Sequence, residues 1–195
     1  MKKIILASGS PRRRELLTQI GISFEVVKAE GEEKITTDDP EEAIKELAMQ
    51  KAQEVAGRVD ADVVIGADTV VAVDGEIMGK PKDPEDAVRM IHRIQGRHHE
   101  VLTGVAVILK KGEVETTINF AETTRVHVFP MTEEEIQAYV ASKEPMDKAG
   151  AYGIQGLFAA YVSGIEGDYN NVVGLPVGRL YQEVKAIADV DLRTL

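Results

Sequence analysis

The sequence contains no cysteine. This absence excludes disulfide bonds, thiolate metal sites and a cysteine nucleophile. Long hydrophobic runs are also missing, because no stretch approaches the roughly 20 apolar residues that a membrane-spanning helix needs. The apolar stretch at residues 4–7 is shorter than the roughly 7–15 residues in the core of an export signal. We therefore expect a cytoplasmic protein with no membrane partner.

Basic residues are scarce: 23 Lys and Arg stand against 33 Asp and Glu, which gives a formal net charge of −10. A protein that binds a nucleic-acid duplex normally carries a basic face, so we expect no nucleic-acid partner. A small anionic substrate is compatible with this composition, because steering depends on local charge. With 195 residues, 44% of them hydrophobic, the chain is predicted to form a single domain over residues 1–195.

The hydrophobic pattern predicts helices that alternate with strands early in the chain, and β-hairpins later. Strands are expected at residues 3–7, 22–27, 62–65, 70–73, 76–78, 101–109, 114–128 and 157–165. Helices are expected to begin at Ser10, Asp39, Asp83, Thr132 and Val177. This order predicts the α/β class, with a mixed β-sheet flanked by helices on both faces.

Local signals support several of these boundaries. Ser10-Pro11, Asp39-Pro40 and Asp83-Pro84 each place a capping residue before a proline at the first helical position. Thr132 and Glu135 have the spacing of a capping box. Asp74-Gly75 predicts a tight hairpin turn.

The turn after the first expected strand carries the strongest chemical signal. Arg12 and Arg13 lie in the first turn of a helix, where a cation opposes the helix dipole by roughly 0.3–1 kcal/mol. A phosphate bound to the free backbone N–H groups there would reverse that cost. Arginine can also bind phosphate in a bidentate manner. The alternative is a capped helix with solvated arginines.

Acidic residues and lysines supply further candidates. Asp68 follows a hydrophobic strand, where an open α/β sheet places its ligands, and could hold magnesium or activate water. The alternative is that Asp68 only forms an Asx-turn with its own backbone. Glu33 lies in an acidic loop that could simply be solvated. Lys51 lies on the apolar stripe of the second helix, where it could face an anion or extend to solvent. Lys80 is either a second anion-binding lysine or a surface residue.

The glycine-rich segment from Asp147 to Gly156 contains Gln155. A glutamine amide presents a donor and an acceptor, as recognition of a base edge requires. The alternative is a bond to the backbone of its own loop. The histidines match no metal-ligand spacing and are predicted to be structural.

Five segments in order resemble the Maf family of nucleoside triphosphate pyrophosphatases over nearly the whole chain. They are Ser8-Gly9-Ser10-Pro11-Arg12-Arg13, Gly66-Ala67-Asp68-Thr69, Lys80-Pro81, residues 147–156 and Val172-Val173-Gly174-Leu175-Pro176. The resemblance implies an ITPase-like α/β fold with a central nucleotide cleft, in a homodimer. It implies attack of water at the α-phosphorus of a nucleoside triphosphate, with pyrophosphate leaving and Mg²⁺ or Mn²⁺ as cofactor.

The same resemblance assigns roles to individual residues. Asp68 matches the proton acceptor. Arg12, Thr69 and Gln155 match the positions that choose the base, and the Gln155 segment is similar to the branch that prefers dTTP and UTP. Phosphate binding is expected from Ser8, Ser10, Arg12, Arg13, Lys51, Lys80 and Lys148, and metal binding from Glu33, Asp68 and Asp147.

Three alternatives remain open at this point. The protein could be a nucleotide-binding regulator of septum formation without turnover. It could hydrolyse CTP or a modified nucleotide, because one methyl group in a pocket is worth only roughly 1–3 kcal/mol. It could also be an ordinary phosphatase that releases orthophosphate.

Overall fold

The computed structural model describes residues 3–195 and divides the chain into two compact units. Unit 1 comprises Met1–Asp68, Thr103–Glu122 and Gly174–Leu195, and unit 2 comprises Thr69–Leu102 and Thr123–Val173. A single domain over residues 1–195 stays a prediction. Among the described helices, none is long and apolar enough to cross a bilayer.

A mixed seven-stranded sheet has the strand order β2-β1-β3-β5-β6-β7, with β4 paired to β3. The strands are β1 (Ile4–Leu6), β2 (Glu25–Val26), β3 (Val63–Val73), β4 (Glu76–Met78), β5 (His98–Lys111), β6 (Val114–Val128) and β7 (Val162–Glu166). Strand β1 is parallel to β2 and β3, whereas the pairs β3–β4 and β6–β7 are antiparallel. The expected α/β class with a mixed sheet is confirmed.

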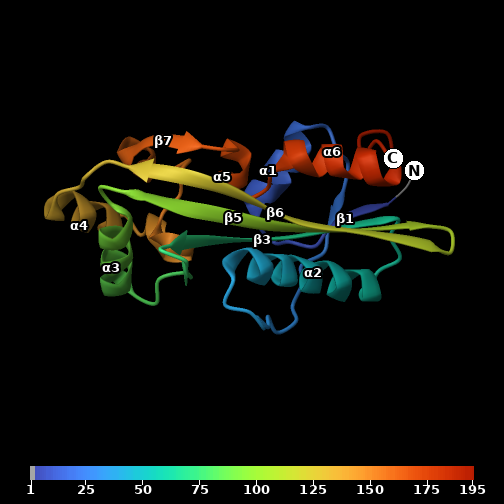
Figure 1. Cartoon of the computed structure of the whole chain (residues 1–195), viewed down its shortest axis with the longest axis horizontal. Coiled ribbons are helices and arrows are strands. Elements are labelled where there is room, and N and C mark those ends of the chain that lie inside the picture. Colours follow the sequence, from blue (N-terminus) through green and yellow to red (C-terminus); the bar gives the residue numbers. More distant parts are fainter. Residues whose placement is uncertain (1–2) are drawn as a thin grey trace. The chain divides into compact units, whose positions relative to one another are not determined.

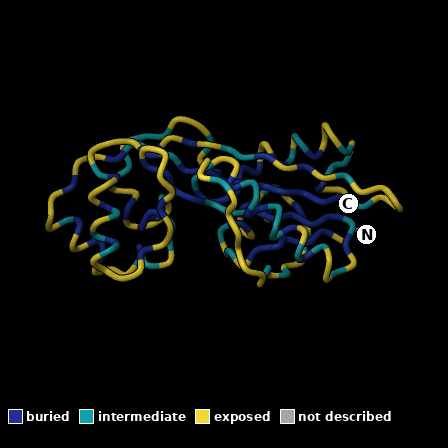
Figure 2. Tube along the Cα trace, turned by 60° about the horizontal axis from the view of Figure 1, so that its bottom comes forward, coloured by how far each residue is buried: buried dark blue, intermediate teal, exposed yellow. Residues whose placement is uncertain are grey.

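Unit 1 has helices on both faces of its part of the sheet. Figure 1 shows α1 (Pro11–Gln19) and α6 (Val177–Ala188) on one side and α2 (Pro40–Arg58) on the other. Apolar side chains of β1, β3, β5 and α2 form a buried cluster, which includes Ile5, Ala48 and Val64. Figure 2 shows runs of buried residues along the strands.

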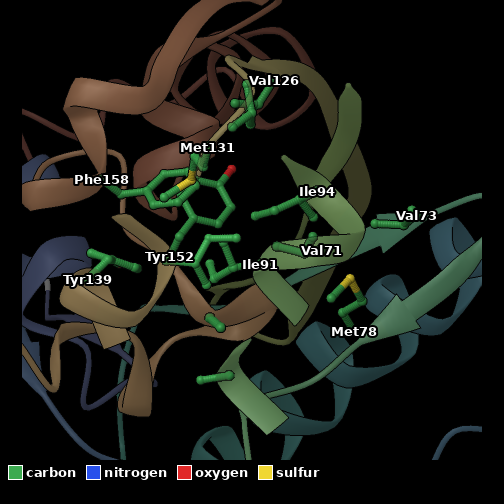
Figure 3. Packing of buried hydrophobic residues seen from close by; sticks show 14 of the residues in the cluster. Val71, Val73, Met78, Ile91, Ile94, Val126, Met131, Tyr139, Tyr152 and Phe158 are labelled. Atoms are coloured by element: carbon green, nitrogen blue, oxygen red, sulfur yellow. The ribbon is translucent and has the colours of Figure 1, made fainter. Parts of the chain in front are cut away.

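Unit 2 has an aromatic core. The helices of unit 2 are α3 (Pro84–Ile94), α4 (Glu133–Ala141), α5 (Tyr169–Val173) and the short 3₁₀ helices η1 (Glu144–Asp147), η2 (Ala149–Ala151) and η3 (Leu157–Tyr161). Phe158 is fully buried, with ring centroids 4.7 Å from Tyr152 and 5.1 Å from Tyr139. Figure 3 shows these rings with Ile91, Ile94 and other apolar side chains of the same cluster.

Most of the predicted helix caps are confirmed. Asp39 accepts a hydrogen bond from the backbone of Glu41, Asp83 accepts one from Asp86, and Thr132 forms both bonds of its capping box. Ser10 does precede α1, but its side chain makes no capping bond, so that part of the prediction is wrong. The first turn of α1 is instead closed by the Ser10 carbonyl, which accepts from the N–H of Arg14.

Four predicted strands differ from the structure. The strand expected at 22–27 forms only at Glu25–Val26, and the one expected at 157–165 begins as the 3₁₀ helix η3. The strands expected at 62–65 and 70–73 form one continuous strand, β3. The chain does not turn at Gly66. Instead, the lack of a side chain at Gly66 allows β3 to pass close to α2. A Cβ atom there would lie 2.7 Å from the Ala52 nitrogen.

Candidate active site

Asp68 does not stand at the end of a strand, as the sequence suggested, but inside β3. It still lies just beyond the parallel part of the sheet, because β1 ends at Leu6, which pairs with Ile65. The backbone N–H of Ala7 donates to the Ile65 carbonyl at 2.8 Å, and no further β1 pairing follows. The chain after β1 then turns into α1, which leaves Asp68 next to the start of that helix.

Arg13 is buried and bonded within unit 1. Its Nε donates to the Gly174 carbonyl at 2.8 Å, and its Nη1 donates to Ser8 Oγ at 3.0 Å. Its Nη2 lies 3.9 Å from Asp68 Oδ1. Burial lowers the pKa of Arg13 from its ordinary value, while the Asp68 carboxylate opposes that shift. The side chain therefore links the turn after β1, the segment that precedes α6, and Asp68.

Ser8 and Ser10 lie together in the turn before α1. Ser8 Oγ accepts the Arg13 bond and a second bond, at 3.3 Å, from the Ser10 N–H. Both of its lone pairs are therefore used, and its hydroxyl proton is the group left to donate. Arg12, one residue before Arg13, is half-buried and forms no ion pair within residues 3–195.

Lys51 joins the two carboxylates that the sequence singled out. Its Nζ lies 2.8 Å from Asp68 Oδ2 and 2.9 Å from Glu33 Oε1. The side chains of Lys51 and Asp68 are only 18% and 19% exposed, whereas that of Glu33 is 55% exposed. Lys51 thus points from α2 toward acidic groups and does not extend into solvent. One cation position between two carboxylates is the central feature of this cluster.

The loop that carries Glu33 is fastened along α2 by three side chains spaced four residues apart. Glu46 accepts from the Thr36 N–H at 2.9 Å, and Glu54 accepts from the Gly31 N–H at 2.8 Å. Between them, Gln50 accepts from the Lys34 N–H at 3.0 Å and donates to the Lys34 carbonyl.

These hydrogen bonds lower the pKa of the two carboxylates that accept them. The pKa of Glu46 is lowered by its bonds to Thr36, and the pKa of Glu54 is lowered by the backbone N–H groups of Glu30 and Gly31. Residue 33 lies between the segments that Gln50 and Glu54 hold. The placement of Glu33 beside Lys51 therefore depends on this row of α2 side chains.

In unit 2, two predicted site residues are bonded to one another. Lys148 Nζ donates to Asp147 Oδ1 and to the Glu144 carbonyl, both at 2.7 Å. Lys80 is exposed, and the Gly79 carbonyl beside it accepts from the Gly150 N–H at 3.0 Å, which brings Lys80 to the same glycine-rich segment. Asp147 and Lys148 are thus a local pair at the C-terminal end of η1, and the lysine closes that turn through the Glu144 carbonyl.

Gln155 is exposed on a turn in which the Gly156 N–H donates to the Gly153 carbonyl at 3.2 Å. A Cβ at Gly153 would lie 2.8 Å from Cε of Lys148, so the lysine stem packs against this turn. Thr69 is half-buried and follows Asp68 in β3.

The structure brings five of the predicted residues together in unit 1: Ser8, Arg13, Glu33, Lys51 and Asp68. In unit 2 it brings Lys80, Asp147, Lys148 and Gln155 to one segment. That the two groups form a single nucleotide site stays a prediction. Sequence reasoning missed Gln50, Glu144 and the Gly174 carbonyl. For Gln50, the four-residue spacing with Glu46 and Glu54 was the only available signal.

A divalent metal fits the unit 1 cluster in part. Within residues 3–195, no group of three or more acidic or histidine side chains gathers closely enough to hold a metal alone. However, Mg²⁺ usually keeps several waters and takes only one or two carboxylates, together with substrate phosphates. Glu33 and Asp68 already face one cationic atom, Lys51 Nζ, and supply that number of carboxylates.

Comparison with known proteins shows one family over nearly the whole chain. The sequence model of a family described as Maf-like protein matches residues 3–187. A dTTP/UTP pyrophosphatase of Agathobacter rectalis is 52% identical, over 96% of this chain and 98% of the relative. Proteins of the same name from Lachnoclostridium phytofermentans and Bacillus cytotoxicus are each 51% identical, over 95% of both chains.

Proposed function

Because the chain belongs to the Maf family, we propose that it hydrolyses dTTP and UTP to the nucleoside monophosphate and pyrophosphate. The single observation that carries this proposal is the position of Asp68, which lies beside Arg13 and is bonded to Lys51, itself bonded to Glu33. Attack of water on a triphosphate needs an acceptor for the water proton and cations for the developing charge. The unit 1 cluster contains both.

In this reaction Asp68 orients the attacking water and accepts its proton at a carboxylate oxygen. Ser8 donates its free hydroxyl proton to a phosphate oxygen, and the N–H groups at the start of α1 add further donors. Glu33 and Asp68 would hold Mg²⁺ or Mn²⁺. When bound, such an ion neutralises phosphate charge and makes water more acidic.

The two neighbouring arginines have different roles in this proposal. Arg12 forms no ion pair within residues 3–195 and is free to contact the nucleotide. Arg13 was expected to bind phosphate, but its guanidinium already contacts Ser8, Gly174 and Asp68. These contacts favour a positioning role, in which Arg13 fixes the catalytic carboxylate and the phosphate-binding serine.

The remaining assignments concern the base and the leaving group. We propose that Gln155, Thr69 and Arg12 select the pyrimidine, and that Ser10, Lys80 and Lys148 contact the phosphates. Asp147 is a further candidate metal ligand. The proposal also includes a homodimeric state, a cytoplasmic location, and no nucleic-acid or membrane partner.

One experiment tests the reaction. The purified protein is incubated with each common nucleoside triphosphate, with and without Mg²⁺ or Mn²⁺, and the products are separated by ion exchange. Monophosphate and pyrophosphate from dTTP and UTP, only with metal, are expected. Diphosphate with orthophosphate would indicate a phosphatase. Tight binding without product would favour a nucleotide-dependent regulator.

A further inference from the structure

The carboxylate of Glu144 holds one end of the turn that presents Gln155. Its Oε2 accepts a hydrogen bond from the Leu157 N–H at 2.9 Å, and its Oε1 accepts one from the Tyr139 hydroxyl at 3.2 Å. Leu157 directly follows Gly156, the last residue of the turn, whose N–H donates to Gly153. Glu144 therefore ties this turn to α4, the helix that carries Tyr139.

Gly156 lies directly against the same carboxylate. A Cβ atom at this position would come within 2.5 Å of both Glu144 oxygens. The backbone of Gly156 has φ −102° and ψ −152°, which is open to residues with side chains. The glycine is thus needed for the close approach of Glu144 and not for its own backbone conformation.

Glu144 is itself fixed from three directions. Its carbonyl accepts from Lys148 Nζ at 2.7 Å, and its N–H donates to Ser142 Oγ at 3.2 Å. Tyr139 is 4% exposed and packs against Phe158 in the aromatic core (Figure 3). Burial, together with the nearby Glu144 carboxylate, raises the pKa of the Tyr139 hydroxyl, so it remains a donor. The turn is thereby fastened to the buried aromatic core of unit 2.

A fixed turn matters because of the chemistry of glutamine. Rotation of the terminal amide by half a turn exchanges its donor and acceptor, so a mobile glutamine can match either uracil or cytosine. It discriminates between them only when its position and orientation are held. The side chain of Gln155 is exposed, so the backbone of its turn must supply much of that constraint.

We propose that Glu144 is a positioning residue for pyrimidine selection: by fixing the turn at 153–156, it lets Gln155 distinguish a uracil or thymine base from cytosine. This inference rests on the proposed hydrolysis of dTTP and UTP. It assigns to Glu144 no contact with the substrate and no part in the chemical step.

The first test compares kcat/KM for UTP and CTP in Glu144→Ala, Glu144→Gln and wild type. Loss of one hydrogen bond of ordinary strength corresponds to about tenfold. We expect Glu144→Ala to lower the preference for UTP by about tenfold, chiefly through KM, with kcat for UTP within about twofold of wild type. Glu144→Gln keeps one acceptor oxygen and should show a smaller loss. An unchanged preference in Glu144→Ala would overturn the proposal, as would an equal loss for both nucleotides through kcat.

A double-mutant cycle with Gly156 gives a sharper test. Gly156→Ala places a methyl group against the carboxylate, so it should displace the turn and lower the UTP preference. In Glu144→Ala/Gly156→Ala the obstructing carboxylate is gone, and the added methyl group should cost nothing beyond the effect of Glu144→Ala alone. Additive losses in the double variant would contradict the proposed contact. Glu133→Gln is the matched control, because Glu133 is an exposed acid of α4 that bonds to Gln137 and not to the turn.

Hydrogen exchange separates this inference from the proposed function. Without nucleotide, the Leu157 amide should exchange at least about tenfold faster in Glu144→Ala than in wild type or Glu133→Gln. If wild type does not hydrolyse dTTP or UTP, the proposed function fails, while the exchange result still tests whether Glu144 holds the turn at 153–156. If wild type is active and Leu157 exchange does not change, the positioning role of Glu144 fails alone.

Discussion

The candidate site residues of the two units differ in the partners that they bond to. In unit 1, charged side chains contact one another: Arg13 lies beside Asp68, and Lys51 bonds to Asp68 and Glu33. In unit 2, the half-buried Glu144 side chain bonds instead to neutral partners, the Leu157 N–H and the Tyr139 hydroxyl. The first arrangement concentrates charge where a reaction needs it, and the second fixes the shape of a loop.

The most buried ionisable groups show the same contrast. Arg13 of unit 1 is buried as a cation next to a carboxylate. His99 of unit 2 is also buried, with Nε2 2.6 Å from the Tyr152 hydroxyl, and burial lowers its pKa to about 4. His99 is therefore neutral at pH 7. Electrostatic interactions should dominate the effect of mutations in unit 1, and packing and neutral hydrogen bonds should dominate in unit 2.

The largest expected effect concerns Asp68. Asp68→Asn keeps the size of the side chain but removes the proton acceptor and the charge that faces Lys51. We expect kcat to fall by about 10²–10⁴-fold, the usual contribution of a general base. Pyrophosphate release measures the loss, and circular dichroism checks the fold. Wild-type-like turnover in a folded Asp68→Asn protein would refute both a proton-accepting and a water-orienting role.

The second prediction compares two neighbouring arginines. Arg13→Ala removes a buried cation with three partners, and breaking a buried pair of this kind typically costs about 3–5 kcal/mol. Arg12→Ala should change the free energy of unfolding by only about 0.5 kcal/mol, because Arg12 is half-buried and forms no ion pair within residues 3–195. Urea denaturation measures both. Equal effects on stability would remove the distinction between an internal anchor and a ligand-facing arginine.

The third prediction concerns the acid sensitivity of unit 2. The folded pKa of His99 is about 4, against 6.5 for an ordinary histidine, so below pH 6.5 the unfolded chain binds a proton that the folded chain does not. The free energy of unfolding should therefore fall by about 3 kcal/mol between about pH 6.5 and pH 4.

His99→Gln provides the test, because glutamine does not titrate and can still bond to Tyr152. The difference in unfolding free energy between wild type and His99→Gln, measured at several pH values, isolates the histidine contribution. If that difference does not change with pH, His99 does not contribute to acid sensitivity.

The smallest expected effect concerns the loop that carries Glu33. Gln50→Ala removes both bonds to Lys34, so Glu33 should spend less time beside Lys51 and Asp68. We expect Mn²⁺ to bind about fivefold more weakly, as loss of about 1 kcal/mol of hydrogen bonding implies. Electron paramagnetic resonance measures binding of Mn²⁺ alone. Gln53→Ala is the matched control, an exposed glutamine of the same helix; equal Mn²⁺ affinity in the two variants would exclude a role for the Gln50 bonds.

Much of the fold could be predicted from short-range patterns. The caps at Asp39, Asp83 and Thr132 involve residues two or three positions apart, and the hairpin at Asp74-Gly75 involves adjacent ones with positive φ. Such features depend on local backbone conformation, which the neighbouring residue types largely decide. The break expected between the strands at 62–65 and 70–73 was wrong. A glycine such as Gly66 can mark either a turn or a close approach, and here it allows β3 to pack closely against α2.

The site was predictable only as a set of residue types. The basic turn, the two acids and Lys51 were identified from their neighbours in the sequence, and the family from five ordered segments. Their partners could not be found in this way. The Arg13 bond to Gly174 spans 161 positions, and the bond between Lys51 and Asp68 spans 17. The bonds of Glu144 to Leu157 and Tyr139 were missed because a single glutamate beside a proline carries no distinctive pattern.

The sequence by itself determined the α/β class, the positions of most helices, the family, and the residue types that can bind phosphate and metal, because these follow from local propensity and short motifs. Only the tertiary structure decided which charges meet. Hydrogen bonds and ion pairs act over a few ångströms, so their partners depend on how distant segments pack. Packing placed Lys51 between Glu33 and Asp68, turned Arg13 inward, and set Glu144 against Gly156.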